Sequence, residues 1–378
     1  MRDATTWRRF LAAALLLSVA VVSGAYAQPT NVFPDADWQE TTPDSQGVDA
    51  AKLKAAVADM DRTFGPAGAK ELVIVRNGYL IWRGPNIDAY HNVWSATKVF
   101  TSTVFGLLIQ DGKCALDDLT VKHLPDLDDQ HPAYARIKLR HLASMSSGYK
   151  GELVNVTAEQ PWGDPMAYLN PTAPLFEAGT QAQYHDHQVF LLGRILTQLA
   201  GESEHALFKR RIADPIGMSQ WDWGVSGKVN GIELNNAAGT PSRAPGIQTT
   251  AREMARFGLL YLNRGQWKGR QLLPASFIEE ATKNQVLGVG ESAFLHARYG
   301  FYWWTNDKKP DGKRPWPSAP PRTYASHGHS CNFCFVIPEW NMVVVRMGTE
   351  PVRSGVAGLA EVDRLWDTFF GKLAVALH

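Results

Sequence analysis

The chain has 378 residues, with 38 lysines and arginines against 37 aspartates and glutamates, and 45% of its residues are hydrophobic. A net charge of +1 removes the electrostatic reason to expect nucleic acid or an acidic membrane surface as a partner. The composition also excludes a disordered or collagen-like chain and indicates a globular protein with a large core.

Residues 1–27 are expected to be a signal peptide rather than part of the fold. Three arginines make the start basic, a mostly apolar run of 13 residues follows over 10–22, and Ala25-Tyr26-Ala27 has the small-x-small pattern of a cleavage site. Thirteen residues are too few for a membrane-spanning helix, which needs about 20. We therefore expect an exported protein, periplasmic or secreted, with no stable membrane span after cleavage. An uncleaved anchor and twin-arginine export are the alternatives.

In chain order, the first predicted elements are a surface helix over 48–62 and two strands over 71–76 and 79–83. Asn77-Gly78 lies between the strands and is a strong hairpin signal. A mostly apolar stretch then runs from Ser95 to Gly112, which predicts a buried helix with a glycine stop.

The signals from 115 to 295 are mainly those of helices and loops, and the 3.6-residue periodicity is clearest over 188–200 and 251–263. Four strand signals follow, at 299–304, 324–326, 332–337 and 342–347, before an amphipathic helix over 357–377. The pattern predicts an α/β fold with an all-α lobe. One sheet flanked by the terminal helices would form a sheet lobe over about 48–114 and 296–378, and an inserted helical lobe would cover about 115–295.

The sequence has three cysteines, Cys114, Cys331 and Cys334. Cys331 and Cys334 are three apart in a predicted strand, so their side chains point to opposite faces and are poorly placed to pair. We expect buried free thiols, and a bond from Cys114 to one of the other two stays open.

The pattern Ser-x-x-Lys occurs twice, at Ser95–Lys98 and at Ser147–Lys150. Ser147 lies in a Ser/Gly-rich turn with no helix after it, so nothing places Lys150 over it. Ser95 lies where the buried helix is predicted to begin, and Lys98 therefore stacks on the same face one turn later. A desolvated lysine near a helix N-terminus loses its proton more easily and can deprotonate a serine. The alternative is a helix-capping serine beside an exposed lysine.

Several downstream segments resemble the class C β-lactamase-like hydrolases of the serine β-lactamase and penicillin-binding-protein superfamily. They are Leu139–Gly148 (LRHLASMSSG), Glu177–Thr180 with Tyr184 and Leu191–Gly193, Asp214–Met218 (DPIGM), and Thr249–Gly265. Together with Ser95-x-x-Lys98, these segments indicate the family far more specifically than any one segment does alone. The resemblance implies a β-lactamase-like fold with a mainly antiparallel sheet and an acyl-enzyme on Ser95. The departures described next resemble family VIII esterases and 6-aminohexanoate-dimer hydrolases.

The family's second motif, Tyr-x-Asn, aligns with Tyr184-His185-Asp186. The resemblance implies that Tyr184 shuttles a proton between Ser95, Lys98 and the leaving group. Asp186 in place of asparagine removes an amide donor that would bind a substrate carbonyl, and it could instead cap the following helix.

The third motif, Lys-Thr-Gly, aligns with Ser326-His327-Gly328. By the resemblance these residues and Asp186 line the substrate, and Gly328 lets the substrate lie against the strand. The backbone N–H groups of Ser95 and His329 would form the oxyanion hole. The missing lysine is the main departure from the β-lactamase pattern.

Two other possible sites fit the sequence less well. Gly328-His329-Ser330 begins like a nucleophile elbow, but a predicted strand follows it where that motif needs a helix. His327, His329 and Cys331 could share one face of a strand as zinc ligands, but Cys334 would face the other. We therefore expect neither a metal nor an organic cofactor.

The expected function is a serine hydrolase that cleaves small-molecule esters or linear amides. A β-lactamase or a D-amino-acid peptidase or carboxypeptidase of the same superfamily is the alternative, and a penicillin-recognising binding module is a further one. Five aromatic residues lie near the motifs in sequence: Trp94, Tyr149, Trp162, Trp303 and Trp304. Some of them are expected to form an apolar wall of the cleft, although core packing explains any one of them equally well.

Overall fold

The computed structural model describes residues 31–125, 127–152, 168–240, 244–286, 290–291, 298–349 and 356–378. The predicted signal peptide, 1–27, and Trp162 lie outside this part of the chain. No helix within it is long and apolar enough to span a bilayer.

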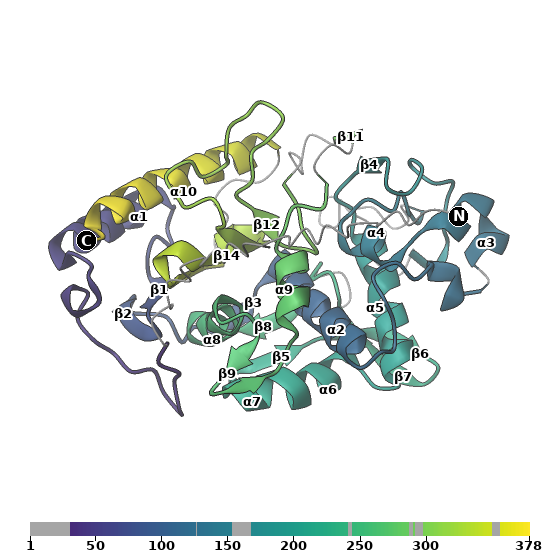
Figure 1. The fold of residues 1–378 in the computed structure, drawn as a ribbon, viewed down its shortest axis with the longest axis horizontal. Coiled ribbons are helices and arrows are strands. Elements are labelled where there is room, and N and C mark those ends of the chain that lie inside the picture. Colours follow the sequence, from purple (N-terminus) through teal and green to yellow (C-terminus); the bar gives the residue numbers. More distant parts are fainter. Residues whose placement is uncertain are drawn as a thin grey trace, which may run out of the picture.

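A six-stranded antiparallel sheet is the centre of the described structure (Figure 1), with strand order β12-β13-β14-β15-β1-β2. Its strands are β1 (Glu71–Arg76), β2 (Tyr79–Arg83), β12 (Trp304–Thr305), β13 (Tyr324–Gly328), β14 (Asn332–Ile337) and β15 (Met342–Met347). The Asn77-Gly78 turn joins β1 to β2, with Asn77 and Gly78 both at positive φ, as a tight hairpin requires. The sheet joins the two ends of the chain because β1 pairs with β15 along its whole length.

The helices are α1 (Ala50–Thr63), α2 (Lys98–Gln110), α3 (Leu127–Gln130), α4 (Leu139–Ala143), α5 (Asp186–Ala200), α6 (Glu204–Phe208), α7 (Asp214–Ile216), α8 (Ala251–Leu262), α9 (Ala275–Ala281) and α10 (Val356–Ala376). Short strands lie among them: β3 (His91–Asn92), β4 (Gln181–Ala182), β5 (Trp221–Trp223), β6 (Val225–Val229), β7 (Ile232–Asn235), β8 (Ile247–Thr249), β9 (Gln266–Trp267), β10 (Arg270–Gln271) and β11 (Gly290–Glu291). The segment 115–295 therefore contains more strand than its sequence suggests.

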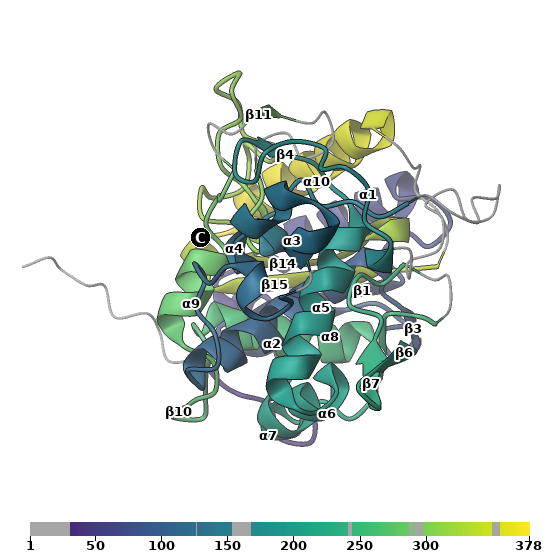
Figure 2. The ribbon, with the colours of Figure 1, turned by 90° about the vertical axis from the view of Figure 1, so that its right-hand side faces the viewer.

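The alternating side chains of β14 show how the sheet is covered on both faces. Phe333 and Phe335 contact Trp366 of α10, with ring centroids 5.4 and 4.5 Å apart. Cys334, between them, points the other way, and its sulfur lies 3.8 Å from the Met254 carbonyl of α8. Helix α10, with α1 beside it, thus covers one face, and α8 covers the other (Figures 1 and 2).

The two lobes are more interleaved than the predicted boundaries allow. Helix α8 lies within the segment assigned to the helical lobe, 115–295, but packs against β1, β14 and β15. Helix α2 lies within the segment assigned to the sheet lobe, 48–114, but packs against α5, α6 and α9. Both helices are buried on nearly all sides. The hydrophobic pattern of such a helix shows that it is buried, but it does not show which elements pack against it.

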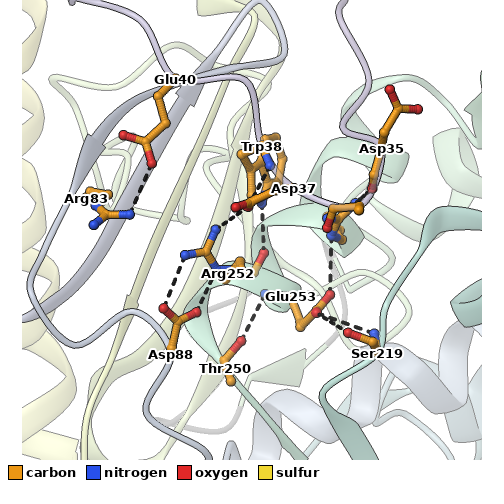
Figure 3. A network of polar contacts seen from close by, with 12 residues as sticks. Asp35, Asp37, Trp38, Glu40, Arg83, Asp88, Ser219, Thr250, Arg252 and Glu253 are labelled. Carbon is orange, nitrogen blue, oxygen red and sulfur yellow. Dashed lines mark hydrogen bonds and ion pairs between the residues drawn. The ribbon is translucent and has the colours of Figure 1, made fainter.

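Residues 31–42, here called the N-terminal strap, cross from the sheet edge to α8 (Figure 3). The Thr41 N–H donates to the Leu80 carbonyl and the Leu80 N–H donates to Gln39, so the strap pairs with the edge strand β2. Arg252 of α8 binds Asp37 of the strap and Asp88, and the buried indole of Trp38 donates to the Arg252 carbonyl at 3.3 Å.

Candidate active site

Ser95 lies in a 3-10 turn, Trp94–Thr97, that leads directly into α2; we call it the Ser95 turn. Trp94 has a φ of 54°, a left-handed conformation that is uncommon for a bulky residue. The Asn92 side chain accepts a hydrogen bond from the Trp94 N–H at 3.1 Å, and the Thr97 hydroxyl accepts one from the Ile247 N–H at 2.8 Å. Strand β8 and Asn92 therefore hold the turn from both ends.

Gly328 lets β13 pass very close to the Ser95 turn. A Cβ at Gly328 would lie 1.9 Å from the Val93 carbonyl oxygen, and a Cβ at Gly239 would lie 2.0 Å from that of Trp94. The resemblance implies that Gly328 makes room for substrate against the strand. In the structure the space that its missing side chain leaves is taken by the protein's own backbone.

Lys98 is the first residue of α2, and its side chain is 1% exposed. Its Nζ donates to Ser95 Oγ at 3.0 Å and to the Ala238 carbonyl at 2.7 Å, and it forms an ion pair with Asp186 Oδ1 at 2.9 Å. Its Nζ also lies 4.9 Å from the ring centre of Tyr184. The structure thus brings together Ser95, Lys98 and Tyr184, the three residues predicted to do the chemistry.

Tyr184 lies two residues before α5, next to the capping residue His185, and is partly buried. Its hydroxyl interacts with both Lys98 and Ser95. Burial raises the pKa of the Tyr184 phenol, although the Lys98 cation opposes the shift. The phenol is therefore neutral at pH 7 and can hand a proton from one neighbour to the other.

The ion pair determines the charge state of Lys98. Burial by itself lowers the pKa of this lysine, but the Asp186 carboxylate and Tyr184 outweigh burial and raise it above 10.5. Burial raises the pKa of Asp186, but Lys98 and the Thr240 hydroxyl outweigh it and lower the pKa below 3.8. The resting site therefore holds a buried ammonium-carboxylate pair, in place of the neutral amine that the sequence predicts at Lys98.

Asp186 has partners within the protein on both of its oxygens, since Oδ1 pairs with Lys98 and Oδ2 accepts from the Thr240 hydroxyl. The cap of α5 is His185, whose ring accepts a hydrogen bond from the His187 N–H, so Asp186 is not the cap. Its role as a substrate-lining residue remains a prediction.

Sequence reasoning missed the segment 236–240, which supplies two partners of this centre, the Ala238 carbonyl and the Thr240 hydroxyl. The Asn236 side chain folds it by accepting from the Gly239 N–H at 2.8 Å and donating to the Thr240 carbonyl at 2.7 Å. An Asn-Ala-Ala-Gly run is a turn signal, but nothing in it indicates that the turn lies at the Ser95 site.

The third-motif residues lie beside the Ser95 turn, which packs against β13. The Ser326 hydroxyl is buried and makes no hydrogen bond to a described residue. The His327 ring stacks on Phe333 at 4.1 Å, and burial together with the Arg298 cation lowers the pKa of His327 to about 3. His327 is therefore neutral at pH 7. It cannot replace the positive charge of the motif lysine, whose position is occupied here by Ser326.

His329 begins a turn, His329–Cys331, which we call the His329 turn. Its exposed ring lies 4.9 Å from the Trp94 ring, so the two turns predicted to form the oxyanion hole are neighbours. Burial of part of the ring lowers the pKa of His329.

The rejected nucleophiles have structural partners. The Ser147 hydroxyl donates to Gln188 Oε1 at 2.7 Å, and the Ser330 hydroxyl donates to the Thr349 carbonyl at 3.1 Å. His187 is buried in α5, and its ring accepts a hydrogen bond from the Gly151 N–H at 2.8 Å.

The three cysteines are buried and unpaired, which confirms the expectation of free thiols. Burial raises the pKa of Cys114 to about 12 and that of Cys331 to about 11. Within the described residues, no three histidine, cysteine, aspartate or glutamate side chains are grouped so as to hold a metal ion.

Two of the predicted aromatic residues lie at the site and two are core residues. Trp304 packs against Tyr184 at 6.3 Å and against His327 at 5.9 Å, and Trp94 packs against His329. Trp303 and Tyr149 are buried, in agreement with the core-packing alternative.

Comparisons with known proteins identify the family and the fold. The Beta-lactamase family model matches residues 71–364. An uncharacterized protein of Alkalihalophilus pseudofirmus is 23% identical over 293 residues, which cover 74% of this chain and 80% of the relative.

Two solved structures share the fold at 19% identity and a TM-score of 0.64. One is a putative beta-lactamase from Bacteroides dorei, aligned over 83% of this chain and 97% of its own. The other is a putative 6-aminohexanoate-dimer hydrolase from Bacillus anthracis, aligned over 89% of this chain and 88% of its own. The family model, the fold and the Ser95–Lys98–Tyr184 geometry lead to one conclusion: the chain belongs to the beta-lactamase family.

Proposed function

We propose that this protein is an exported serine hydrolase that cleaves ester or linear amide bonds through an acyl-enzyme on Ser95. The observation that carries the proposal is the contact between Lys98 Nζ and Ser95 Oγ at 3.0 Å, with Tyr184 interacting with both groups. Ser95 attacks the acyl carbon, its proton passes to Lys98 and Tyr184, and the leaving group departs with a proton. Water then hydrolyses the acyl-enzyme.

The ion pair requires one further step, because an ammonium group cannot accept the serine proton. Asp186 is the group placed to take a proton from Lys98, since their atoms are 2.9 Å apart. Transfer within the pair replaces two buried charges by a neutral amine and a neutral acid. It removes their desolvation cost but also their attraction, and the raised pKa of Lys98 and the lowered pKa of Asp186 make the neutral pair the minor form. Lys98 then accepts the proton of Ser95, directly or through Tyr184.

The third motif favours an ester or linear amide over a β-lactam. A β-lactam carries a carboxylate that the family's motif lysine helps to bind, and a charge-assisted contact contributes roughly 1.5–3 kcal/mol, or about ten- to a hundredfold in binding. Here Ser326 stands in the lysine position and His327 is neutral. The family name and the Bacteroides dorei structure favour the runner-up, a β-lactamase.

A labelling experiment tests the nucleophile. A fluorophosphonate probe should modify Ser95 in the wild-type protein, and modification at Ser147 or Ser330 instead would overturn the assignment. Lys98→Ala and Tyr184→Phe should each lower kcat by about 10²- to 10⁴-fold without loss of the folded state, as expected for groups that transfer protons. Circular dichroism checks the fold of each variant.

A substrate comparison tests the specificity. Short p-nitrophenyl esters should have a much larger kcat/KM than a chromogenic cephalosporin. Comparable values would favour the β-lactamase alternative. Export is tested by sequencing the N-terminus of the protein recovered from the periplasm or medium, which should begin at Gln28.

A further inference from the structure

The His329 turn contains two consecutive residues in the left-handed region. Ser330 has a φ of 62° and Cys331 a φ of 57°. Neither is glycine, so each conformation is unfavourable by itself and persists only if the surroundings hold it. Trp94, beside Ser95, is left-handed as well. Strained backbone thus lies next to both N–H groups of the proposed oxyanion hole, those of Ser95 and His329.

The guanidinium of Arg346, on β15, is the group that holds the His329 turn. It is completely buried, and its NH1 donates to the Ser330 carbonyl at 2.6 Å and to the Cys331 carbonyl at 3.4 Å. Its other two nitrogens donate to carbonyls after α1, Nε to Gly68 at 3.1 Å and NH2 to Phe64 at 3.2 Å. One rigid, planar group therefore fixes the turn relative to the main sheet.

Asn332 completes this support from the start of β14. Its Nδ2 donates to the His329 carbonyl at 2.6 Å and to the Gly348 carbonyl at 3.2 Å, and its Oδ1 accepts from the Gly348 N–H at 3.0 Å. The carbonyl groups of all three residues in the turn are thus bound by Arg346 or Asn332. This fixes the orientation of the peptide planes that follow the His329 N–H.

The way Arg346 is bound indicates more than packing. Burying a charge is costly, and an apolar side chain would fill a position in the middle of a sheet without that cost. The contacts of this guanidinium are four carbonyls, two of them in the strained turn. The arginine is therefore suited to stabilising a backbone conformation that the sequence Ser330-Cys331 would not adopt alone.

We propose that Arg346 is a positioning residue for the oxyanion hole. It holds the His329 turn so that the His329 N–H stays directed at the carbonyl oxygen of the group that Ser95 attacks. The inference rests on the proposed function, since the oxyanion forms only if Ser95 acylates. Removal of Arg346 should therefore weaken binding of the tetrahedral intermediate much more than binding of the substrate.

The test compares Arg346→Met with Arg256→Met. Arg256, on α8, is a matched control because it is a buried arginine that also donates to carbonyls, those of Asp35, Ala36 and Ile216, away from both turns. The readouts are kcat and KM for a p-nitrophenyl ester and the inhibition constant of a trifluoromethyl ketone, whose hemiketal oxyanion occupies the hole. Thermal unfolding measures the stability of each variant.

Arg346→Met should lower kcat by about 10- to 100-fold, which is the loss expected when one oxyanion donor is partly misplaced. The affinity for the trifluoromethyl ketone should fall by a similar factor. KM should change by less than about threefold. Arg256→Met should lose stability but keep kcat and ketone affinity. If Arg346→Met does not fold, Arg346→Lys carries the test, because a lysine can reach the turn carbonyls but not all four. It should show a smaller loss in the same two readouts.

The outcomes separate the two proposals. Arg346 variants that bind the ketone as tightly as the wild-type protein would overturn the positioning role and leave the serine hydrolase standing. A wild-type protein that neither hydrolyses the ester nor forms the hemiketal would overturn both.

Discussion

At the scale of single residues, the charge state of Lys98 depends mainly on its neighbour Asp186. Asp186 replaces the amide expected from the family motif and places a carboxylate 2.9 Å from the lysine. Burial shifts the neighbouring groups away from neutral pH, because it lowers the pKa of His185 and of His327 and raises that of Tyr184. The pair therefore controls how activity depends on pH.

Asp186→Asn should change the shape of the pH profile. In the wild-type protein the proton moves within the pair, whose proton count is constant between the lowered pKa of Asp186 and the raised pKa of Lys98. The pair should thus leave kcat/KM nearly flat between about pH 7 and pH 9. In the variant the Asp186 carboxylate no longer offsets burial, and Tyr184 alone opposes it, so the pKa of Lys98 falls below its wild-type value. The ratio kcat/KM should then fall as the pH drops through that lowered pKa.

The measurement is kcat/KM for an ester from pH 6 to pH 10. Asp37→Asn, which removes the same charge from the N-terminal strap, should keep the wild-type profile. A wild-type profile that rises steadily toward pH 10, unchanged by Asp186→Asn, would contradict the proton route through Asp186.

At the scale of elements, the Ser95 turn depends on backbone segments that are far away in the sequence. The sequence predicted the helix and placed Lys98 over Ser95, but it could not show that the helix begins at Lys98 and that a strained 3-10 turn precedes it. That turn is shaped by the close approach of Gly328 and Gly239.

Gly328→Ala tests the close approach. The new methyl group would lie 1.9 Å from the Val93 carbonyl, so the strand or the turn must move. The expected cost is about 1–3 kcal/mol of unfolding free energy, with a fall in kcat. Gly371→Ala, in α10, is the control and should change stability by less than about 1 kcal/mol. Urea unfolding and ester hydrolysis measure both, and equal behaviour of the two variants would contradict the argument.

Local sequence signals predicted the elements that depend on local chemistry. The hairpin at Asn77-Gly78 and the bounds of β14 and β15 agree with the prediction because turn chemistry and buried strand runs are local. The strand expected over 299–304 is reduced to Trp304–Thr305 and one bridge from Tyr299, since aromatic side chains there pack as core rather than as a ladder.

At the scale of the whole molecule, the N-terminal strap joins the sheet edge to α8 by two kinds of contact. The ion pairs of Arg252 involve exposed carboxylates, with Asp37 71% and Asp88 57% exposed, and such pairs contribute about 0–1 kcal/mol. Trp38 is buried, and truncating a buried tryptophan costs about 3–5 kcal/mol. Apolar anchoring should therefore dominate. The sequence signals did not identify this segment as an element, because the contacts that anchor it to Leu80 and to α8 are distant in sequence.

Trp38→Ala should accordingly lower the free energy of unfolding by about 3 kcal/mol or more, and Arg252→Met by about 1 kcal/mol or less. Urea unfolding at low and at high salt measures both. A larger loss for Arg252→Met, abolished by salt, would show that the ion pairs hold the strap.

The pairing of the strap with Leu80 also bears on how the protein avoids association. Strand β2 is the last strand of the main sheet, and an uncovered edge strand offers free N–H and C=O groups to the edge of another molecule. Gln39 and Thr41 occupy those groups of Leu80. A chain whose strap is displaced or cut should therefore form edge-to-edge aggregates while its core is still folded. Such a chain would lose solubility under conditions in which it does not yet unfold.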